Sequence, residues 1–356
     1  MRPPIEYPQT RDAMLAHLRV RLGGVVPDVE IRIKAELAVE VNRLKHEKRA
    51  VILGHNYMEP ALYHSVPDFT GDSLYLSRVA AKSEADRVVF CGVRFMAETA
   101  KILNPRRLVL LPSEKGGCSL AEAISGDDVR ALRALHPGVP VVSYVNTYAD
   151  VKAETDICCT SSNAVAVVRH LLAQGHDRVI FLPDEYLARN VAQEVGIEIV
   201  LARRGGADTA PHTGGKPTMI GWSGRCEVHE KFTVEDIRAV RGQFDDVVVL
   251  AHPECSPEVV QASDFSGSTT DMIRYVEDME RGRYLLLTEC SMGDNIAARN
   301  PQREMLRLCS VRCPHMNEIS LEETLESLRQ DRFVIEVPEE IRAKAHASLD
   351  RMIGIG

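Results

Sequence analysis

Cysteine is the residue type in this sequence with the most potential for metal chemistry, and the chain contains nine cysteines and 12 histidines. Cys91 follows the apolar run 88–90, and the pair at 158–159 follows a similar segment. We expect these thiols to be small buried hydrophobic side chains. No CxxC spacing occurs, which disfavours a simple zinc knuckle. Three other cysteines lie in Gly- or Pro-flanked loops ahead of helix-like segments: Cys118, Cys226 and Cys313.

The segment 221–229 shows the setting of one of these cysteines. It follows the apolar run 218–220, holds the only Trp of the chain and offers Cys226 and then His229. An apolar strand that ends in a glycine-rich turn is where α/β proteins commonly place binding groups. One cysteine cannot hold a metal alone, so the interpretation depends on elements that bring the other two close.

Those elements are indicated by an internal repeat, because three segments align with one another: 51–80, 141–168 and 248–276. Each is an apolar strand that ends in a polar triplet, continues through a short helix and reaches a second strand that ends in small hydroxyl residues. The triplets begin at His55, Tyr144 and His252. The hydroxyl residues that follow at nearly equal spacing are Ser73, Ser161, Ser268 and Thr269.

The second half of each repeat also matches. A strand is predicted at 87–90, 178–181 and 283–287, followed by a polar loop, a helix and then one of the three cysteines. The alternation of strands and helices predicts an α/β fold of three similar three-layer αβα domains with parallel sheets. We expect them to pack about a pseudo-threefold axis with a central active site.

The predicted domain boundaries follow the repeats. Residues 1–27 are interpreted as a weakly patterned N-terminal extension, and 28–47 as an amphipathic helix. The first α/β repeat covers 28–125 and is completed by 316–356. The second covers 126–232 and the third 233–315.

If the three units face inward, their polar triplets, hydroxyl residues and cysteines meet in one cavity, because parallel sheets bind ligands beyond the carboxyl ends of their strands. Three thiolates suit zinc or an iron–sulfur cluster, and a cluster with three cysteines leaves one iron open as a Lewis acid. The hydroxyl residues are expected to cap helices whose N-termini suit anions. Candidate acid–base and hydrogen-bonding groups are His55, Tyr57, Tyr144, Asn146, His229, His252 and Glu254.

Composition excludes several classes of function. The net charge is −8 and the pI about 5.9, with no long basic run, so a nucleic-acid or anionic membrane surface is disfavoured. No signal peptide and no membrane-spanning run of about 20 apolar residues is indicated. Dinucleotide and Walker signatures are absent from the sequence. We therefore expect a cytoplasmic protein that acts on small molecules.

A set of motifs resembles the quinolinate synthase family over roughly residues 30–345. The motifs are GHNY (54–57), GDS (71–73), FMAETAKILNP (95–105), YVNT (144–147), TSSNA (160–164), GWSGRCEVHEKF (221–232), HPEC (252–255), GST (267–269) and CPHMN (313–317). The resemblance implies three α/β domains around a central cavity and a [4Fe-4S] cluster. It implies that iminoaspartate and dihydroxyacetone phosphate condense to quinolinate, phosphate and water for NAD biosynthesis. An L-aspartate oxidase or dehydrogenase would supply iminoaspartate.

Residue roles follow from the same resemblance. The cluster ligands would be Cys118, Cys226 and Cys313. Groups implicated in proton transfer would be Tyr57, His229, His252 and Glu254. Contacts to substrate carboxylate or phosphate would come from His55, Ser73, Ser161, Ser268 and Thr269, and Tyr144 and Asn146 would line the cavity. His229 has no counterpart in the other copies, which suggests catalysis for His229 and cluster binding for Cys226.

One stretch departs from the family pattern, since 290–295 is more polar than usual and leaves the local structure before Asn300 open. Cys309, four residues before Cys313, could form a redox-linked disulfide with it. Three other functions stay open. One is a radical enzyme similar to diphthamide synthase, which the HNY and HPEC segments disfavour. The others are a non-catalytic iron–sulfur redox sensor and a zinc-stabilised binding protein.

Overall fold

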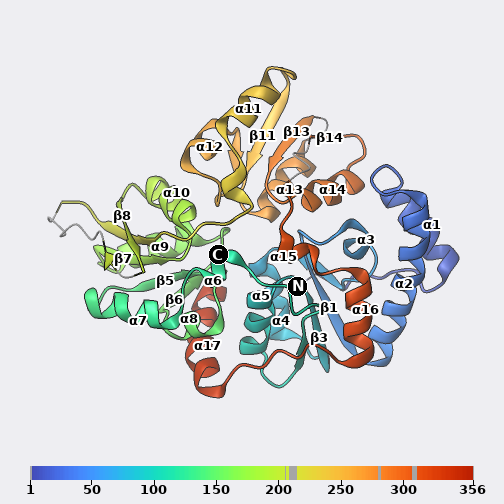
Figure 1. Ribbon diagram of the computed structural model, residues 1–356, viewed down its shortest axis with the longest axis horizontal. Helices are drawn as coiled ribbons and strands as arrows, with labels where there is room; N and C mark the ends of the chain where they lie inside the picture. Colours follow the sequence, from blue (N-terminus) through green and yellow to red (C-terminus); the bar gives the residue numbers. More distant parts are fainter. Residues whose placement is uncertain (1, 205, 208–214, 280–281, 307–310, 356) are drawn as a thin grey trace.

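Three parallel sheets form the framework of the protein. The structure, a computed structural model, describes residues 2–204, 206–207, 215–279, 282–306 and 311–355. The strand orders are β2-β1-β3-β4, β6-β5-β7-β10-β8-β9 and β12-β11-β13-β14. The predicted α/β class is therefore confirmed, and Figure 1 shows the three sheets in three corners of the molecule. The pseudo-threefold axis itself stays a prediction.

The same strand order recurs in each sheet, because β6-β5-β7-β10 repeats the pattern of the other two and β8 and β9 are added at one edge. All pairings are parallel except β8 with β9. The strands are β1 (Ala50–His55), β2 (Phe69–Gly71), β3 (Arg87–Cys91), β4 (Leu108–Leu110), β5 (Val141–Tyr144), β6 (Ile157–Cys159), β7 (Arg178–Leu182), β8 (Glu198–Arg203), β9 (Gly206–Ala207), β10 (Thr218–Trp222), β11 (Val247–Ala251), β12 (Phe265–Ser266), β13 (Arg283–Leu287) and β14 (Glu304–Leu306).

Helices flank the three sheets, as expected where crossovers join parallel strands. The central strands are buried Val-, Ile- and Leu-rich runs, so their sheets need cover on both faces. The helices of the three units are α3 (Pro60–Tyr63), α4 (Ser73–Lys82), α5 (Arg94–Leu103), α6 (Ser119–Glu122), α7 (Gly126–Leu135), α8 (Ala149–Ala153), α9 (Ala164–Ala173), α10 (Glu185–Val195), η1 (His229–Lys231), α11 (Val234–Arg241), α12 (Pro257–Ala262), α13 (Thr269–Asp278), α14 (Cys290–Arg299) and α15 (Pro314–Asn317).

An aspartate ahead of the edge strand is repeated in all three units. The carboxylates of Asp68, Asp156 and Asp264 each accept a hydrogen bond from a backbone N–H of the neighbouring strand, at 2.7, 2.8 and 2.7 Å. The backbone N–H of each aspartate also donates to the carbonyl of that strand residue. Identical contacts at equivalent positions show that the sequence repeat is a structural repeat.

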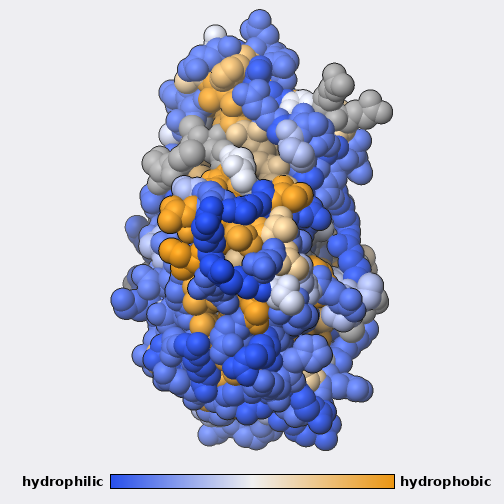
Figure 2. Space-filling model, turned by 90° about the vertical axis from the view of Figure 1, so that its right-hand side faces the viewer, coloured by the Kyte–Doolittle hydropathy of each residue, from blue (hydrophilic) through white to orange (hydrophobic). Residues whose placement is uncertain are grey.

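The N-terminal region corrects one prediction. Residues 1–27 lack a clear pattern in sequence, yet α1 (Arg11–Leu22) forms there, with Thr10 as its N-cap. Only Met14, Leu18 and Leu22 of α1 are buried, against α2 (Asp28–Glu47), so the narrow apolar stripe gives a weak periodic signal. The predicted helix 28–47 is confirmed by α2. Figure 2 shows apolar surface on this side of the molecule. Val20 of α1 and Val29 and Ile33 of α2 are exposed.

The segment after α15 returns to the first two sheets. Helix α16 (Leu321–Gln330) packs against α2 and β3, and α17 (Glu339–Gly354) packs against α8, β6 and α5. We keep the predicted domain boundaries as a proposal, to which these contacts add that α17 joins two units. Within the described ranges, no helix has the length and apolar character required to cross a membrane.

Candidate active site

One cavity lies where the ends of the three sheets meet. It collects 13 of the 14 candidate residues, namely His55, Tyr57, Ser73, Cys118, Tyr144, Asn146, Ser161, Cys226, His229, His252, Glu254, Thr269 and Cys313. Ser268 does not line it. The Ser268 hydroxyl donates to Asp271 Oδ2 at 2.6 Å and caps α13. The structure thus brings together side chains that lie up to 258 residues apart, counted from His55 to Cys313.

The expected helix caps are correct at one of three positions. Ser268 caps α13 as predicted, but α4 is capped by Asp72, whose side chain accepts from Tyr75 N at 2.9 Å. Ser73 is the first residue inside that helix. Asn163, not Ser161, is the N-cap residue of α9. A hydroxyl residue before an apolar run signals a helix start to within one or two residues only.

Each cysteine of interest comes from a different unit. Cys118 is the N-cap residue of α6, Cys226 lies after β10 and Cys313 is the N-cap residue of α15. All three are free thiols that line the cavity. Cys91, Cys158 and Cys159 are buried outside the cavity lining, as predicted. The proposed partner Cys309 lies outside the described residues.

The three thiols suit either a single zinc ion or an iron–sulfur cluster. Over the described ranges, the compact group of possible ligand atoms, which lie within 4.8 Å of one another, belongs to Cys226, His229 and Glu254. The three cysteines line one cavity and come from three units, so they suit one shared metal group.

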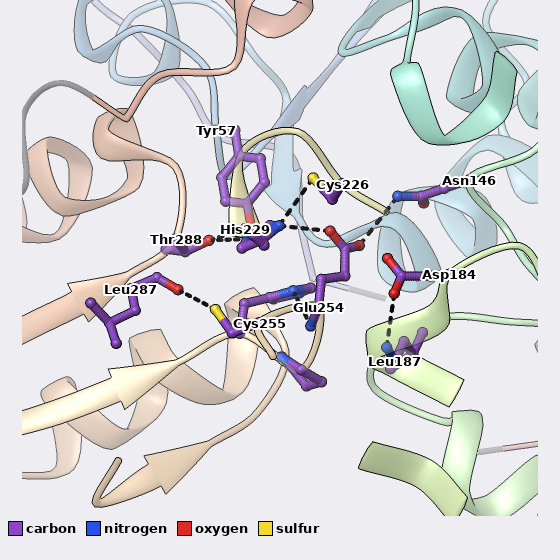
Figure 3. A network of polar contacts seen from close by, with 12 residues as sticks. Tyr57, Asn146, Asp184, Leu187, Cys226, His229, Glu254, Cys255, Leu287 and Thr288 are labelled. Carbon is purple, nitrogen blue, oxygen red and sulfur yellow. Dashed lines mark hydrogen bonds and ion pairs between the residues drawn. The ribbon is translucent and has the colours of Figure 1, made fainter. Parts of the chain in front are cut away.

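A chain of short hydrogen bonds runs through the cavity (Figure 3). Tyr57 OH lies 2.5 Å from Thr288 Oγ1, which lies 3.0 Å from His229 Nε2. His229 Nδ1 lies 2.7 Å from Glu254 Oε2 and 3.2 Å from Cys226 Sγ. The 2.7 Å separation is typical of a charge-assisted hydrogen bond. When both ring nitrogens carry a proton, Nδ1–H faces the Glu254 carboxylate and Nε2–H donates to the Thr288 hydroxyl, which in turn donates to the Tyr57 oxygen.

The Glu254 carboxylate contacts two further residues besides His229. Tyr144 OH donates to Glu254 Oε1 at 2.5 Å, and Asn146 Nδ2 donates to the same atom at 3.4 Å. Burial alone would raise the pKa of the Glu254 carboxyl, but the positive charge and hydrogen bond of His229 outweigh it and hold the pKa well below its usual range. Glu254 is therefore a carboxylate that orients and stabilises His229.

Two more histidines of the cavity, His55 and His252, are neutral near pH 7. Burial lowers the pKa of His55 to about 4 and that of His252 to about 3. The His252 ring stacks on His229, with centroids 4.7 Å apart. Burial, followed by the charge of Glu254, raises the pKa of Tyr57 well above its usual value. Tyr57 therefore holds its proton and acts as a donor.

Sequence reasoning did not assign a role to Thr288. It follows β13, the central strand of the third sheet, so the rule that places polar groups at strand ends also applies to it. Its link to Tyr57 joins residues 231 positions apart and is not visible in sequence. Other lining residues without a predicted role are Phe95, Met96, Thr160, Ser162, Glu289 and His315.

The fold and the cavity define an α/β enzyme in which three units contribute one cysteine each to a site with acid–base groups. Half-buried thiols that line one cavity support a metal or iron–sulfur cofactor. The family described as "Quinolinate synthetase A protein" matches residues 39–354.

Curated relatives extend this match over nearly the whole chain. It is 47% identical over 340 residues to "Quinolinate synthase 2" of Mesorhizobium japonicum, covering 96% of this chain and 98% of the relative. "Quinolinate synthase" of Caulobacter vibrioides is 46% identical over 345 residues, or 97% and 88%. "Quinolinate synthase" of Agrobacterium fabrum is 47% identical over 340 residues, or 96% and 92%. The chain belongs to the quinolinate synthase family.

Proposed function

We propose that this enzyme condenses iminoaspartate with dihydroxyacetone phosphate to give quinolinate, phosphate and water. Family membership supports a quinolinate synthase of NAD biosynthesis. The observation that carries the detailed proposal is the convergence of Cys118, Cys226 and Cys313 on the cavity that also holds the chain from Tyr57 to Glu254. Binding, dehydration and ring closure all require anion contacts, proton donors and a Lewis acid in one site.

The cofactor that we propose is a [4Fe-4S] cluster held by Cys118, Cys226 and Cys313. Their origin in three units and their place in one cavity support it. When bound, a cluster with three cysteine ligands supplies an open iron that polarises a carboxylate or hydroxyl oxygen. The thiols lie on loops that begin short helices, so the fold orients them before any metal arrives.

The anionic groups of the substrates fit the helix starts that face the cavity. Ser73 begins α4, Thr269 begins α13, and Ser161 lies in the turn before α9. Free N–H groups and the helix dipole at such positions favour carboxylate and phosphate. Neutral His55 adds a hydrogen-bonding ring that carries no charge. We propose these four residues as substrate contacts, and we drop Ser268 from the set because its hydroxyl is used in the cap.

Proton transfer is proposed for the chain of Tyr57, Thr288, His229 and Glu254. Tyr57 donates a proton to a leaving oxygen, and its own proton is replaced through Thr288 from His229. The Glu254 carboxylate stabilises the positive charge that His229 carries between transfers. His252, neutral and stacked on His229, keeps a second positive charge away from that ring.

Iminoaspartate is an imine that water hydrolyses, so an L-aspartate oxidase or dehydrogenase close by would need to supply it. We propose functional coupling to such an enzyme. Free thiols and a proposed iron–sulfur cofactor suit a reducing compartment, and we place the reaction in the cytoplasm on that basis.

The test is quinolinate formation by protein purified without oxygen, with iron and zinc measured on the same sample. We expect about four irons per chain and quinolinate only when both substrates are present. A colourless protein that contains zinc would contradict the cofactor. Cluster-dependent cleavage of S-adenosylmethionine without quinolinate formation would instead favour the radical enzyme.

A further inference from the structure

The turns that follow the central strands are built in two different ways. After β1, Tyr57 N–H lies 3.3 Å from His55 Nδ1, and after β11, Glu254 N–H lies 3.3 Å from His252 Nδ1. In each of these turns, the residue three positions after the histidine donates its N–H to the histidine carbonyl. One histidine thus closes the turn with both its ring and its backbone.

The turn after β5 has Tyr144 in place of the histidine, so no imidazole ring accepts a backbone N–H there. The N–H of Thr147 donates to Val145 O at 2.8 Å, which makes a tighter turn. The hydroxyls of Ser143 and Thr147 donate to Tyr144 O at 3.1 and 3.3 Å. The Val145 carbonyl takes that one backbone bond, and both Val145 and Thr147 are buried, where carbonyl groups need hydrogen-bond partners.

Lys152 on α8 satisfies both carbonyls. Its Nζ donates to Val145 O at 2.9 Å and also to Thr147 O. The side chain is 0% exposed, and Nζ lies 5.6 Å from the centre of the Phe95 ring, which lines the cavity. Among the ion pairs of the described residues, none includes Lys152, and burial lowers the pKa of this lysine.

A lysine at this place is particular to the second unit. Lys152 lies four residues before Asp156, one of the three aspartates that bond to the neighbouring strand. The residues four positions before the other two, Asp68 and Asp264, are His64 and Val260. A buried ammonium group without a carboxylate partner is expensive, so its two carbonyl contacts define what it does. Lys152 therefore stabilises the turn after β5, which has no histidine to close it.

That turn carries the two residues of the second unit that contact Glu254. Tyr144 OH lies 2.5 Å and Asn146 Nδ2 3.4 Å from Glu254 Oε1. We propose that Lys152 is a positioning residue that acts through Tyr144 and Asn146 to hold Glu254 against His229. The expected effect of Lys152 on catalysis rests on the proposed function. The expected effect on the turn rests on the turn geometry alone.

The experiment compares Lys152→Met with Lys45→Met, each in the full-length protein loaded with iron. Methionine retains the unbranched stem and removes the N–H donors. Lys45 is the control for the loss of a buried ammonium group: it is 8% exposed, and its Nζ donates to Val66 O at 2.9 Å and pairs with Asp68 Oδ1 at 2.9 Å, away from the cavity lining. We expect kcat/KM for quinolinate formation to fall at least tenfold in Lys152→Met, and less than threefold in Lys45→Met, at equal iron content.

Amide hydrogen exchange gives a readout that does not depend on activity. We expect peptides covering 144–149 to exchange at least tenfold faster in Lys152→Met and at the wild-type rate in Lys45→Met. Unchanged exchange there would overturn the proposal even if wild-type protein formed no quinolinate. Absence of product from the wild type with faster exchange in the variant would overturn the proposed function and support the role of Lys152 in the turn.

A double-mutant cycle separates positioning from general destabilisation. Tyr144→Phe removes the hydroxyl through which Lys152 is proposed to act, so adding Lys152→Met to it should cost less than threefold further activity. Adding Lys152→Met to Ser73→Ala, a change in the first unit, should cost the full tenfold. Equal losses in the two backgrounds would overturn the proposal.

Discussion

The two ends of the three sheets differ in how strictly they repeat. Ahead of the edge strands, Asp68, Asp156 and Asp264 are the same residue type and make the same bond to the neighbouring strand. At the cavity end, the third residue of each triplet differs: Tyr57, Asn146 and Glu254. The identical aspartates serve folding, which all three units require. The different residues at the cavity end bring different chemical groups to one substrate.

The three cysteines are the exception at the cavity end, because all units retain one, and they give the largest expected effect. Replacing Cys118, Cys226 or Cys313 by Ala should abolish the iron content and the colour, since each would remove one of only three proposed ligands. Iron analysis and visible absorbance of anaerobically purified protein measure this. Cys91→Ala, a buried thiol on β3, is the control. A comparable loss of iron from Cys91→Ala would contradict the assignment.

Thr288→Val tests the divergent groups without touching the cysteines. Valine keeps the shape but removes the hydroxyl that joins Tyr57 to His229. We expect kcat to fall on the order of 100-fold, as for loss of a positioned proton-transfer group, with iron content unchanged. Thr324→Val, at another buried threonine, should leave kcat within about twofold, because its hydroxyl donates to the carbonyl of the N-cap residue Ser320 and lies 3.6 Å from Cys91 Sγ, outside the cavity lining. Full activity of Thr288→Val would exclude this route for protons.

Asp264→Ala tests the repeated end. It removes the acceptor that lies 2.7 Å from Val249 N–H, and we expect the free energy of unfolding to fall by about 1–3 kcal/mol. Activity per folded molecule should stay at the wild-type value. Denaturant titration together with kinetics on the folded fraction measures both, and Asp245→Ala at an exposed site is the control. A fall in kcat without a loss of stability would contradict the assignment of Asp264 to folding.

Ser268 is the N-cap residue of α13, whereas Ser73 is the first residue inside α4, and this contrast gives the smallest effect. Ser268→Ala removes the α13 cap and should cost about 0.5–2 kcal/mol of stability. Ser73→Ala should change stability by less than about 0.5 kcal/mol and raise KM, because Asp72 supplies the α4 cap and Ser73 faces the cavity. Thermal unfolding measures the stability of both variants, and steady-state kinetics measures their KM. The opposite pattern would show that the two serines have been assigned the wrong way round.

The sequence was sufficient for the fold class and for most of the cavity. Parallel strands buried on both faces read as short apolar runs, so β1, β5 and β11 and the polar triplets after them are visible directly. Repetition then reduced nine cysteines to the three that share the cavity. Periodicity also predicted α2 with its observed bounds.

What could not be predicted depends on contacts between distant segments. The hydrogen bond of Thr288 to Tyr57 arises only when the first and third units pack, and the bonds of Tyr144 and Asn146 to Glu254 only when the second and third do. Helix α1 was missed because it buries only three residues. Ser268 was assigned to substrate because sequence cannot show that its hydroxyl is used by Asp271.

The packing of α17 has a consequence for the order of events during synthesis. This helix follows all three sheets in the chain, yet it lies against α8, β6 and α5 of the first two units, and Ser348 donates to Lys152 O at 3.0 Å. The chain leaves the ribosome N-terminus first, so the contacts that α17 adds across the seam between those units form only after residues 339–354 have emerged.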